Sequence, residues 1–252
     1  MQNEIKILNK DGLMVAEKNT ATAQSAVYHA LKKNIMSLQL KPGTAMSTQE
    51  IASKLNVSRT PVREAFIRLQ RDGLVDIFPQ KETLVSKIDF SKVAQERFIR
   101  ESLECANVDL LIGKFTKHDL SIMELNIEKQ LVAMRNKEHS LHIELDNEFH
   151  SYMFKITNQE LSWQIIENTS NHYARIRLLS VNDENIMHET ILQHQKILSA
   201  VYDEDAEHAK MYIKTHLHQL EGQLQQILNT YPSYFDQNLI PDEDRFAALL
   251  AK

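Results

Sequence analysis

Apolar residues recur at helical spacing near the start of the chain. Val27, Leu31 and Ile35 fall on one face of the segment 25–37, because residues three or four apart lie on the same side of an α-helix. The segment is therefore predicted to be helical. Lys41-Pro42-Gly43 follows it with residues typical of a turn.

Two short helices joined by a tight turn come next. Ser47 and Glu50 have the spacing of a capping box, in which the hydroxyl caps the first helix and the carboxylate bonds back to the N-cap backbone. Asn56-Val57 is predicted to form the turn, and Ser58 is the expected N-cap of the second helix. Asp72-Gly73 is expected to end that helix.

A β-hairpin is predicted after these helices, with strands at 74–78 and 83–85 and a tip at 79–82. Two helices followed by a hairpin form a winged helix-turn-helix, in which the start of the second helix contacts base edges. DNA contacts are expected at Ser58, Arg59, Thr60, Arg63, Gln49, Gln80 and Lys81. A small three-helix domain with a solvated basic face would show the same periodicity.

From Asp89 onward the pattern predicts helices alone. Short polar breaks separate six amphipathic segments, at 90–114, 117–135, 139–156, 160–182, 186–203 and 205–229. Short connections favour antiparallel neighbours. The predicted fold class is mainly α, with an N-terminal winged helix-turn-helix and a C-terminal all-helical antiparallel bundle.

The two parts differ in charge, which indicates separate tasks. Residues 20–88 hold ten Lys and Arg against five Asp and Glu, whereas residues 89–252 hold 16 against 26. A basic segment can approach DNA phosphates, and an acidic segment is repelled by them. The net charge of −5 therefore does not exclude a DNA-binding protein.

Composition narrows the class further. Five glycines and five prolines in 252 residues argue against a turn-rich β fold, and the single Cys105 excludes an intramolecular disulfide. No apolar run approaches the roughly 18 residues that cross a membrane. We expect a cytoplasmic protein without membrane contact, divided into a flexible arm at 1–20, the winged domain at 21–88, an effector-binding and dimerisation domain at 89–231, and a tail at 232–252 with one short helix near Phe246–Leu250.

Four polar residues of the predicted bundle can point inward. Asp146 and His150 are one helical turn apart, and His194 and His216 each neighbour apolar residues of their own segments. Three imidazoles and one carboxylate suit a divalent ion such as zinc or nickel. Such an ion would satisfy groups that are costly to bury unpaired. Scattered core or surface histidines are the alternative.

The run Val57-Ser58-Arg59-Thr60-Pro61-Val62-Arg63-Glu64-Ala65, followed by Leu69 and Asp72-Gly73-Leu74-Val75, closely resembles the DNA-binding domain of the GntR family. The resemblance extends without a gap over 40–85 and implies a transcription regulator. Gln49 stands where members often have an arginine, and Glu82 stands near a wing position that is often glycine. These departures leave the operator sequence open.

A second resemblance covers the bundle. It is carried by Arg100, Glu104, Asp146-x-x-Phe149-His150, Asn158, His194-x-x-Ile197-x-x-Ala200-Val201, Asp205-Ala206 and His216-Leu217. These residues are similar to the FCD ligand-binding domain of the FadR branch, and the six segments favour its VanR-type subgroup. Members with this aspartate and these histidines hold a metal, which implies the ligands Asp146, His150, His194 and His216.

The two resemblances imply a homodimeric repressor on an inverted-repeat operator. Four protein ligands leave coordination positions for a small carboxylate effector, and Arg100, His172 and Arg175 are its expected anchors. Arg175 and Arg177 are two residues apart, so at most one is expected inside, and His142 is expected at the rim. The alternatives are a metalloenzyme, a regulator whose metal is structural or is itself the signal, and a metal-free acyl-CoA sensor.

Overall fold

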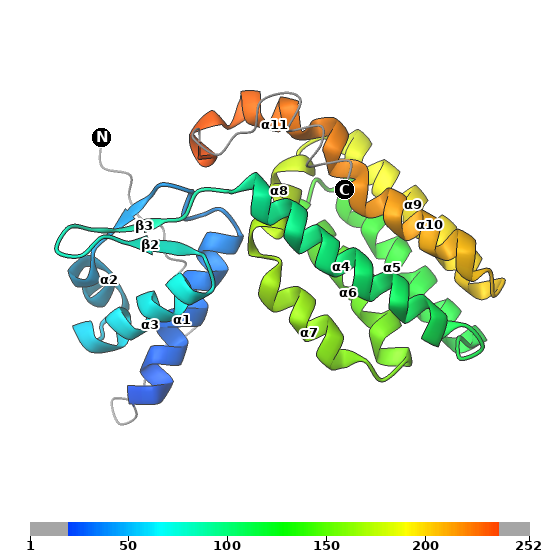
Figure 1. Cartoon of the computed structure of the whole chain (residues 1–252), viewed down its shortest axis with the longest axis horizontal. Helices are drawn as coiled ribbons and strands as arrows, with labels where there is room; N and C mark the ends of the chain where they lie inside the picture. The colour runs from blue at the N-terminus through cyan, green and yellow to red at the C-terminus, as the bar shows by residue number, and fades with distance from the viewer. Residues whose placement is uncertain (1–19, 237–252) are drawn as a thin grey trace. The chain divides into compact units, whose positions relative to one another are not determined.

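A computed structural model describes residues 20–236 (Figure 1). They form two compact units, one comprising 20–89 and 231–236 and the other 90–230. The predicted arm at 1–20 lies outside the described residues except for Thr20, which begins the first helix, and the predicted helix near 246–250 lies outside them altogether. Within the described part, no helix is long and apolar enough to cross a membrane.

The first unit is the predicted winged helix-turn-helix. Its elements are α1 (Thr20–Met36), β1 (Ala45–Met46), α2 (Thr48–Leu55), α3 (Arg59–Arg71), β2 (Val75–Ile77), β3 (Thr83–Val85) and the 3-10 turn η2 (Pro232–Tyr234). The antiparallel sheet has the order β1-β3-β2, with Ala45 opposite Leu84 and Val75 opposite Val85. Strand β1 was not predicted, because two residues are too few to show an alternating pattern.

The helices end at the predicted cap residues, but two of the expected cap bonds are not made. Ser47 Oγ accepts a hydrogen bond from the Glu50 backbone N–H at 3.0 Å, and Asn56 ends α2 in the left-handed conformation. The Glu50 carboxylate pairs with Lys54 at 3.1 Å, so the reciprocal bond of a capping box is not made. Ser58 is the N-cap of α3 but makes no side-chain cap bond.

The core of this unit is built from the predicted apolar stripes. Helices α1 and α3 pack on each other, and Leu31 and Ile35 of α1 share a cluster with Phe66 of α3. The chain returns to this unit after the bundle. There the Ile88 backbone N–H donates to the Tyr234 carbonyl at 2.9 Å.

The second unit is a helical bundle, as predicted (Figure 1). Its elements are α4 (Phe90–Leu111), α5 (Lys117–Arg135), α6 (His139–Ile156), α7 (Glu160–Thr169), α8 (Asn171–Ser180), α9 (Glu184–Tyr202), α10 (Ala206–His218), the 3-10 segment η1 (Gln219–Gln223) and α11 (Leu224–Thr230). The pairs α5–α6, α5–α9, α9–α10 and α4–α10 pack together. Phe149, Ile191 and Ile213 belong to the core that they share.

The prediction of six helical segments is wrong, because two segments are broken. The segment 205–229 is interrupted by η1, and the segment 160–182 breaks at Ser170. Glu96 of α4 stabilises the new helix start after the second break, since its carboxylate accepts hydrogen bonds from the first-turn N–H groups of His172 and Tyr173 at 2.8 and 2.7 Å. The segment count therefore gives no support to the VanR-type subgroup.

Candidate metal centre and DNA-contact surface

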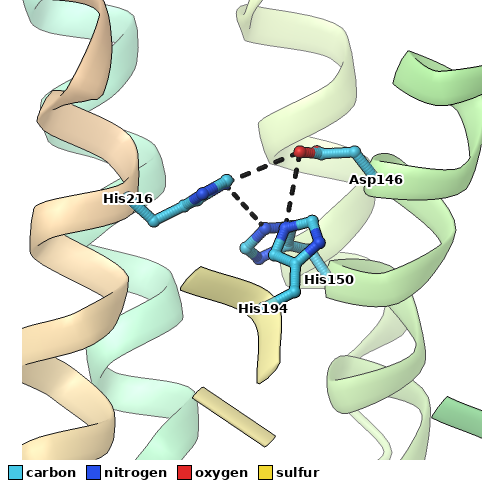
Figure 2. Close-up of side chains that lie close together, drawn as sticks. All are labelled: Asp146, His150, His194 and His216. Carbon is cyan, nitrogen blue, oxygen red and sulfur yellow. Dashed lines mark hydrogen bonds and ion pairs between the residues drawn. The ribbon is translucent and has the colours of Figure 1, made fainter. Parts of the chain in front are cut away.

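Three helices bring the four predicted metal ligands together in the bundle. Asp146 and His150 come from α6, His194 from α9 and His216 from α10 (Figure 2). All four are buried, and their ligand atoms lie within 4.8 Å of one another. The Nε2 atoms of His194 and His216 are 3.5 and 3.6 Å from Asp146 Oδ1, and the Nε2 atoms of His150 and His216 are 3.2 Å apart.

A side-chain oxygen holds each imidazole at its other nitrogen. The Nδ1 contacts are His150 to Glu104 at 2.6 Å, His194 to Gln130 at 2.8 Å and His216 to Gln193 at 3.1 Å. Such partners place the imidazole proton on Nδ1 and orient the ring. The Nε2 lone pairs are then directed to the centre of the cluster.

The residues present fit a divalent metal. His194 Nε2 is buried and, among the described residues, makes no hydrogen bond beyond its 3.5 Å contact with Asp146 Oδ1. Burial lowers the pKa of His194 to about 4 and that of His216 well below its usual value, so both rings stay neutral near pH 7. Neutral imidazole is the form that binds metals, and three imidazoles with one carboxylate suit zinc or nickel.

Two arginines and a second carboxylate surround this cluster. Asp146 Oδ2 accepts a hydrogen bond from Arg177 and lies 3.7 Å from Arg100 Nη2, while Arg100 Nε donates to Glu104 at 2.6 Å. Burial alone would raise the pKa of Asp146, but Arg177, His194 and His150 together outweigh it and hold the pKa well below its usual range. Burial is likewise outweighed at Glu104, where His150 and Arg100 lower the pKa to about 2. Both carboxylates are therefore ionised beside two guanidinium cations.

A narrow cavity adjoins the cluster. Asp146, His216 and Arg177 are among its lining residues. Arg175 and His172 do not line this cavity. Both are buried on α8, where Arg175 contacts His172 Nδ1 at 3.3 Å. The expectation that at most one of Arg175 and Arg177 lies inside is wrong, because nearly every residue of α8 is buried.

Three residues near the cluster were misplaced or missed from the sequence. His142, expected at the rim, is fully buried and lines the cavity. Gln130 and Gln193 were not identified as imidazole partners. Gln130 carries a usable signal, because it extends the buried stripe of Met123 and Ile127 at helical spacing. A polar residue at such a position needs a buried partner.

The predicted DNA-contact residues are exposed on the first unit. Ser58, Arg59 and Thr60 form the start of α3, and Gln49 lies on α2. One surface concavity is lined by the remaining predicted residues, Arg63, Gln80 and Lys81, together with Glu82. Gln80 occupies the wing tip in the left-handed conformation, with φ of +60°. Helix α3 and the wing tip thus border one surface of this unit.

Comparison with known proteins decides the family. The chain is 31% identical over 218 residues to the HTH-type transcriptional repressor RspR of Escherichia coli K12, a match that covers 86% of this chain and 96% of the relative. The chain belongs to the GntR family of bacterial regulatory proteins. The model of that family matches residues 23–85, and the FCD domain model matches 97–219, the combination of the FadR branch.

Other known proteins are similar to most of the chain at lower identity. The HTH-type transcriptional regulator YdhC of Bacillus subtilis is 26% identical, over 75% of this chain and 85% of the relative. A putative GntR regulator from Rhodococcus sp. RHA1 shares the fold with a TM-score of 0.67 at 23% identity, and covers 83% of this chain and 99% of its own. McbR/YncC of E. coli has a TM-score of 0.66 at 22% identity, over 83% of this chain and 98% of its own. The family consists of transcription regulators, so the metalloenzyme alternative is set aside.

Proposed function

We propose that this GntR-family regulator is a repressor whose operator affinity is controlled by a small carboxylate bound beside a metal ion. The ion would be held by Asp146, His150, His194 and His216. A divalent ion with four protein ligands keeps coordination positions that a carboxylate oxygen can fill. The effector is expected to enter through the cavity that Asp146, His216 and Arg177 line.

The charge balance of the site is the observation that carries this proposal. Asp146 and Glu104 offset Arg100 and Arg177, and the pKa values of His194 and His216 are lowered. A divalent cation adds two positive charges to this buried and otherwise balanced group. Burying uncompensated charge is costly, so an anionic ligand is favoured there. The narrow cavity also favours a small carboxylate over an acyl-CoA chain.

The proposed DNA step uses the exposed start of α3 and the wing tip. Arg59 and Arg63 are four residues apart on one helix, and a guanidinium can bond guanine bidentately or clamp a phosphate. Gln80 and Lys81 would contact the neighbouring groove or backbone. The first unit carries the excess of basic residues, which supports its role as the DNA-binding part.

We further propose a cytoplasmic homodimer that binds an inverted-repeat operator. Phe98 and Leu161 are 64% and 70% exposed on α4 and α7, two helices that pack on each other, and apolar side chains exposed on neighbouring helices are suited to a contact with a second copy. A dimer presents two recognition helices, so its operator has matching half-sites. The effector changes DNA affinity only through its different affinities for the DNA-bound and free states.

Isothermal titration calorimetry with butanoate tests whether the metal serves in sensing. Zinc-loaded protein should bind the acid, whereas metal-stripped protein and the zinc-treated His194→Ala variant should not. His188→Ala is the matched control, because His188 is an exposed histidine of the same helix. Equal binding by loaded and stripped protein would show that the metal is structural or is itself the signal.

A further inference from the structure

His142 is a buried polar residue that the metal cluster does not use. It lies on α6 one turn before Asp146, and its side chain is 0% exposed. Neither ring nitrogen makes a hydrogen bond to a described residue; the Gln130 carbonyl is near the ring but outside hydrogen-bond geometry. Burying a polar group without a partner costs about 1–3 kcal/mol. A native structure retains such a group where a ligand or an ordered water meets it.

The position of His142 indicates whether a ligand or an ordered water meets its ring. It lines the same cavity as Asp146, His216 and Arg177. Three hydroxyl groups that line this cavity each donate to a protein oxygen: Ser180 to the Arg177 carbonyl at 2.7 Å, Thr190 to Gln219 at 3.2 Å and Tyr173 to the Leu217 carbonyl at 3.0 Å. His142, unlike these hydroxyl groups, retains its hydrogen-bonding capacity for a molecule in the cavity.

The geometry points to His142 as a second anchor of the effector, one that bonds a hydroxyl group at the end remote from the carboxylate. This inference rests on the proposed function, which places the carboxylate at the Asp146 and His216 end. Four residues of α-helix separate Asp146 from His142, a rise of about 6 Å. This separation is short, and 4-hydroxybutanoate, with three methylene groups between its hydroxyl and its carboxylate, is a probe of comparable length.

The chemistry of the imidazole selects a hydroxyl group over a second carboxylate. A neutral imidazole offers one N–H donor and one acceptor nitrogen, and a hydroxyl group can match either of them. A carboxylate only accepts, and a second one would bring a further negative charge into the buried site. The narrowness of the cavity favours an unbranched chain.

Calorimetry on zinc-loaded, full-length protein tests this anchor with two acids of equal chain length. Wild type should bind 4-hydroxybutanoate about tenfold more tightly than butanoate, the effect expected of one buried hydrogen bond. His142→Phe should bind both acids with the affinity that wild type has for butanoate. His142→Gln, which keeps a donor and an acceptor, should retain part of the preference, and the exposed-site control His188→Phe should retain all of it.

Zinc content and thermal stability of each variant establish that it is folded and loaded. Equal binding of the two acids by wild type, or a preference that persists in folded His142→Phe, overturns the role of His142 and leaves carboxylate sensing intact. If neither acid binds, or if both bind equally without zinc, the proposed function itself fails.

Discussion

Replacing Glu104 with glutamine tests whether a residue that is not itself a metal ligand contributes to the affinity for the metal. The Glu104 carboxylate is fully buried and lies 2.6 Å from both His150 Nδ1 and Arg100 Nε. Glutamine keeps an oxygen that can accept from one of these groups. It removes the negative charge and leaves the other donor facing an amide, so Glu104→Gln gives up one charge-assisted hydrogen bond.

The expected loss follows from these contacts. A hydrogen bond to a charged group contributes about 1.5–3 kcal/mol, and removing an outer partner of a metal-bound histidine lowers metal affinity about 10- to 100-fold. We expect Glu104→Gln to bind zinc about 30-fold more weakly, equivalent to about 2 kcal/mol. The lost charge acts in the same direction, because Arg100 is then not fully neutralised beside a cation.

Competition against a fluorescent zinc chelator measures this affinity. Glu101→Gln is the matched control, since Glu101 is also on α4 and contacts His218 at 2.8 Å, away from the cluster. The control should bind zinc as wild type does. Wild-type affinity in folded Glu104→Gln would refute the claim that Glu104 holds His150 for metal binding.

Three further predictions concern the other parts of the chain. Arg63→Ala should weaken operator binding by about 1–3 kcal/mol and relax base preference at one position, measured by fluorescence anisotropy on a set of operator variants; unchanged affinity and preference would exclude Arg63 from base contacts. In the metal-free protein, burial lowers the pKa of His194 from 6.5 to about 4, so the unfolded chain binds more protons between these values. The free energy of unfolding by urea should therefore decrease more as the pH falls from 6.5 to 4 in wild type than in His194→Phe, and equal changes in the two proteins would contradict the buried neutral ring. Tyr28→Phe should destabilise the first unit by about 1 kcal/mol in thermal unfolding, because the Tyr28 hydroxyl donates to Asp72 at 2.5 Å, and no change would show that this bond is dispensable.

Local signals explain why much of the first unit could be predicted. The Ser47 cap, the Asn56 turn and the apolar face of α3 depend on residues within a few positions of each other. Local signals alone did not predict the metal ligands, because Asp146 and His150 share a helix whereas His194 and His216 come from two other helices. The spacing of these four residues did not exclude scattered histidines without a shared metal. The resemblance to the FCD domain favoured the cluster.

Long-range contacts explain what the sequence did not reveal. The start of α8 after the break at Ser170 is capped by Glu96, whose bond to the His172 N–H spans 76 residues of the chain. Gln130 reaches His194 across 64 residues, and no local pattern pairs them. His142 was misjudged for a related reason, because whether it lies at the rim or in the interior depends on how the bundle closes around α6.

Anomalous diffraction at the zinc edge, from crystals of zinc-loaded protein, tests the metal assignment most directly. The account predicts one strong peak per chain, about 2.0–2.2 Å from Nε2 of His150, His194 and His216 and from a carboxylate oxygen of Asp146. A peak bound by other residues, or no peak among these four, would contradict it.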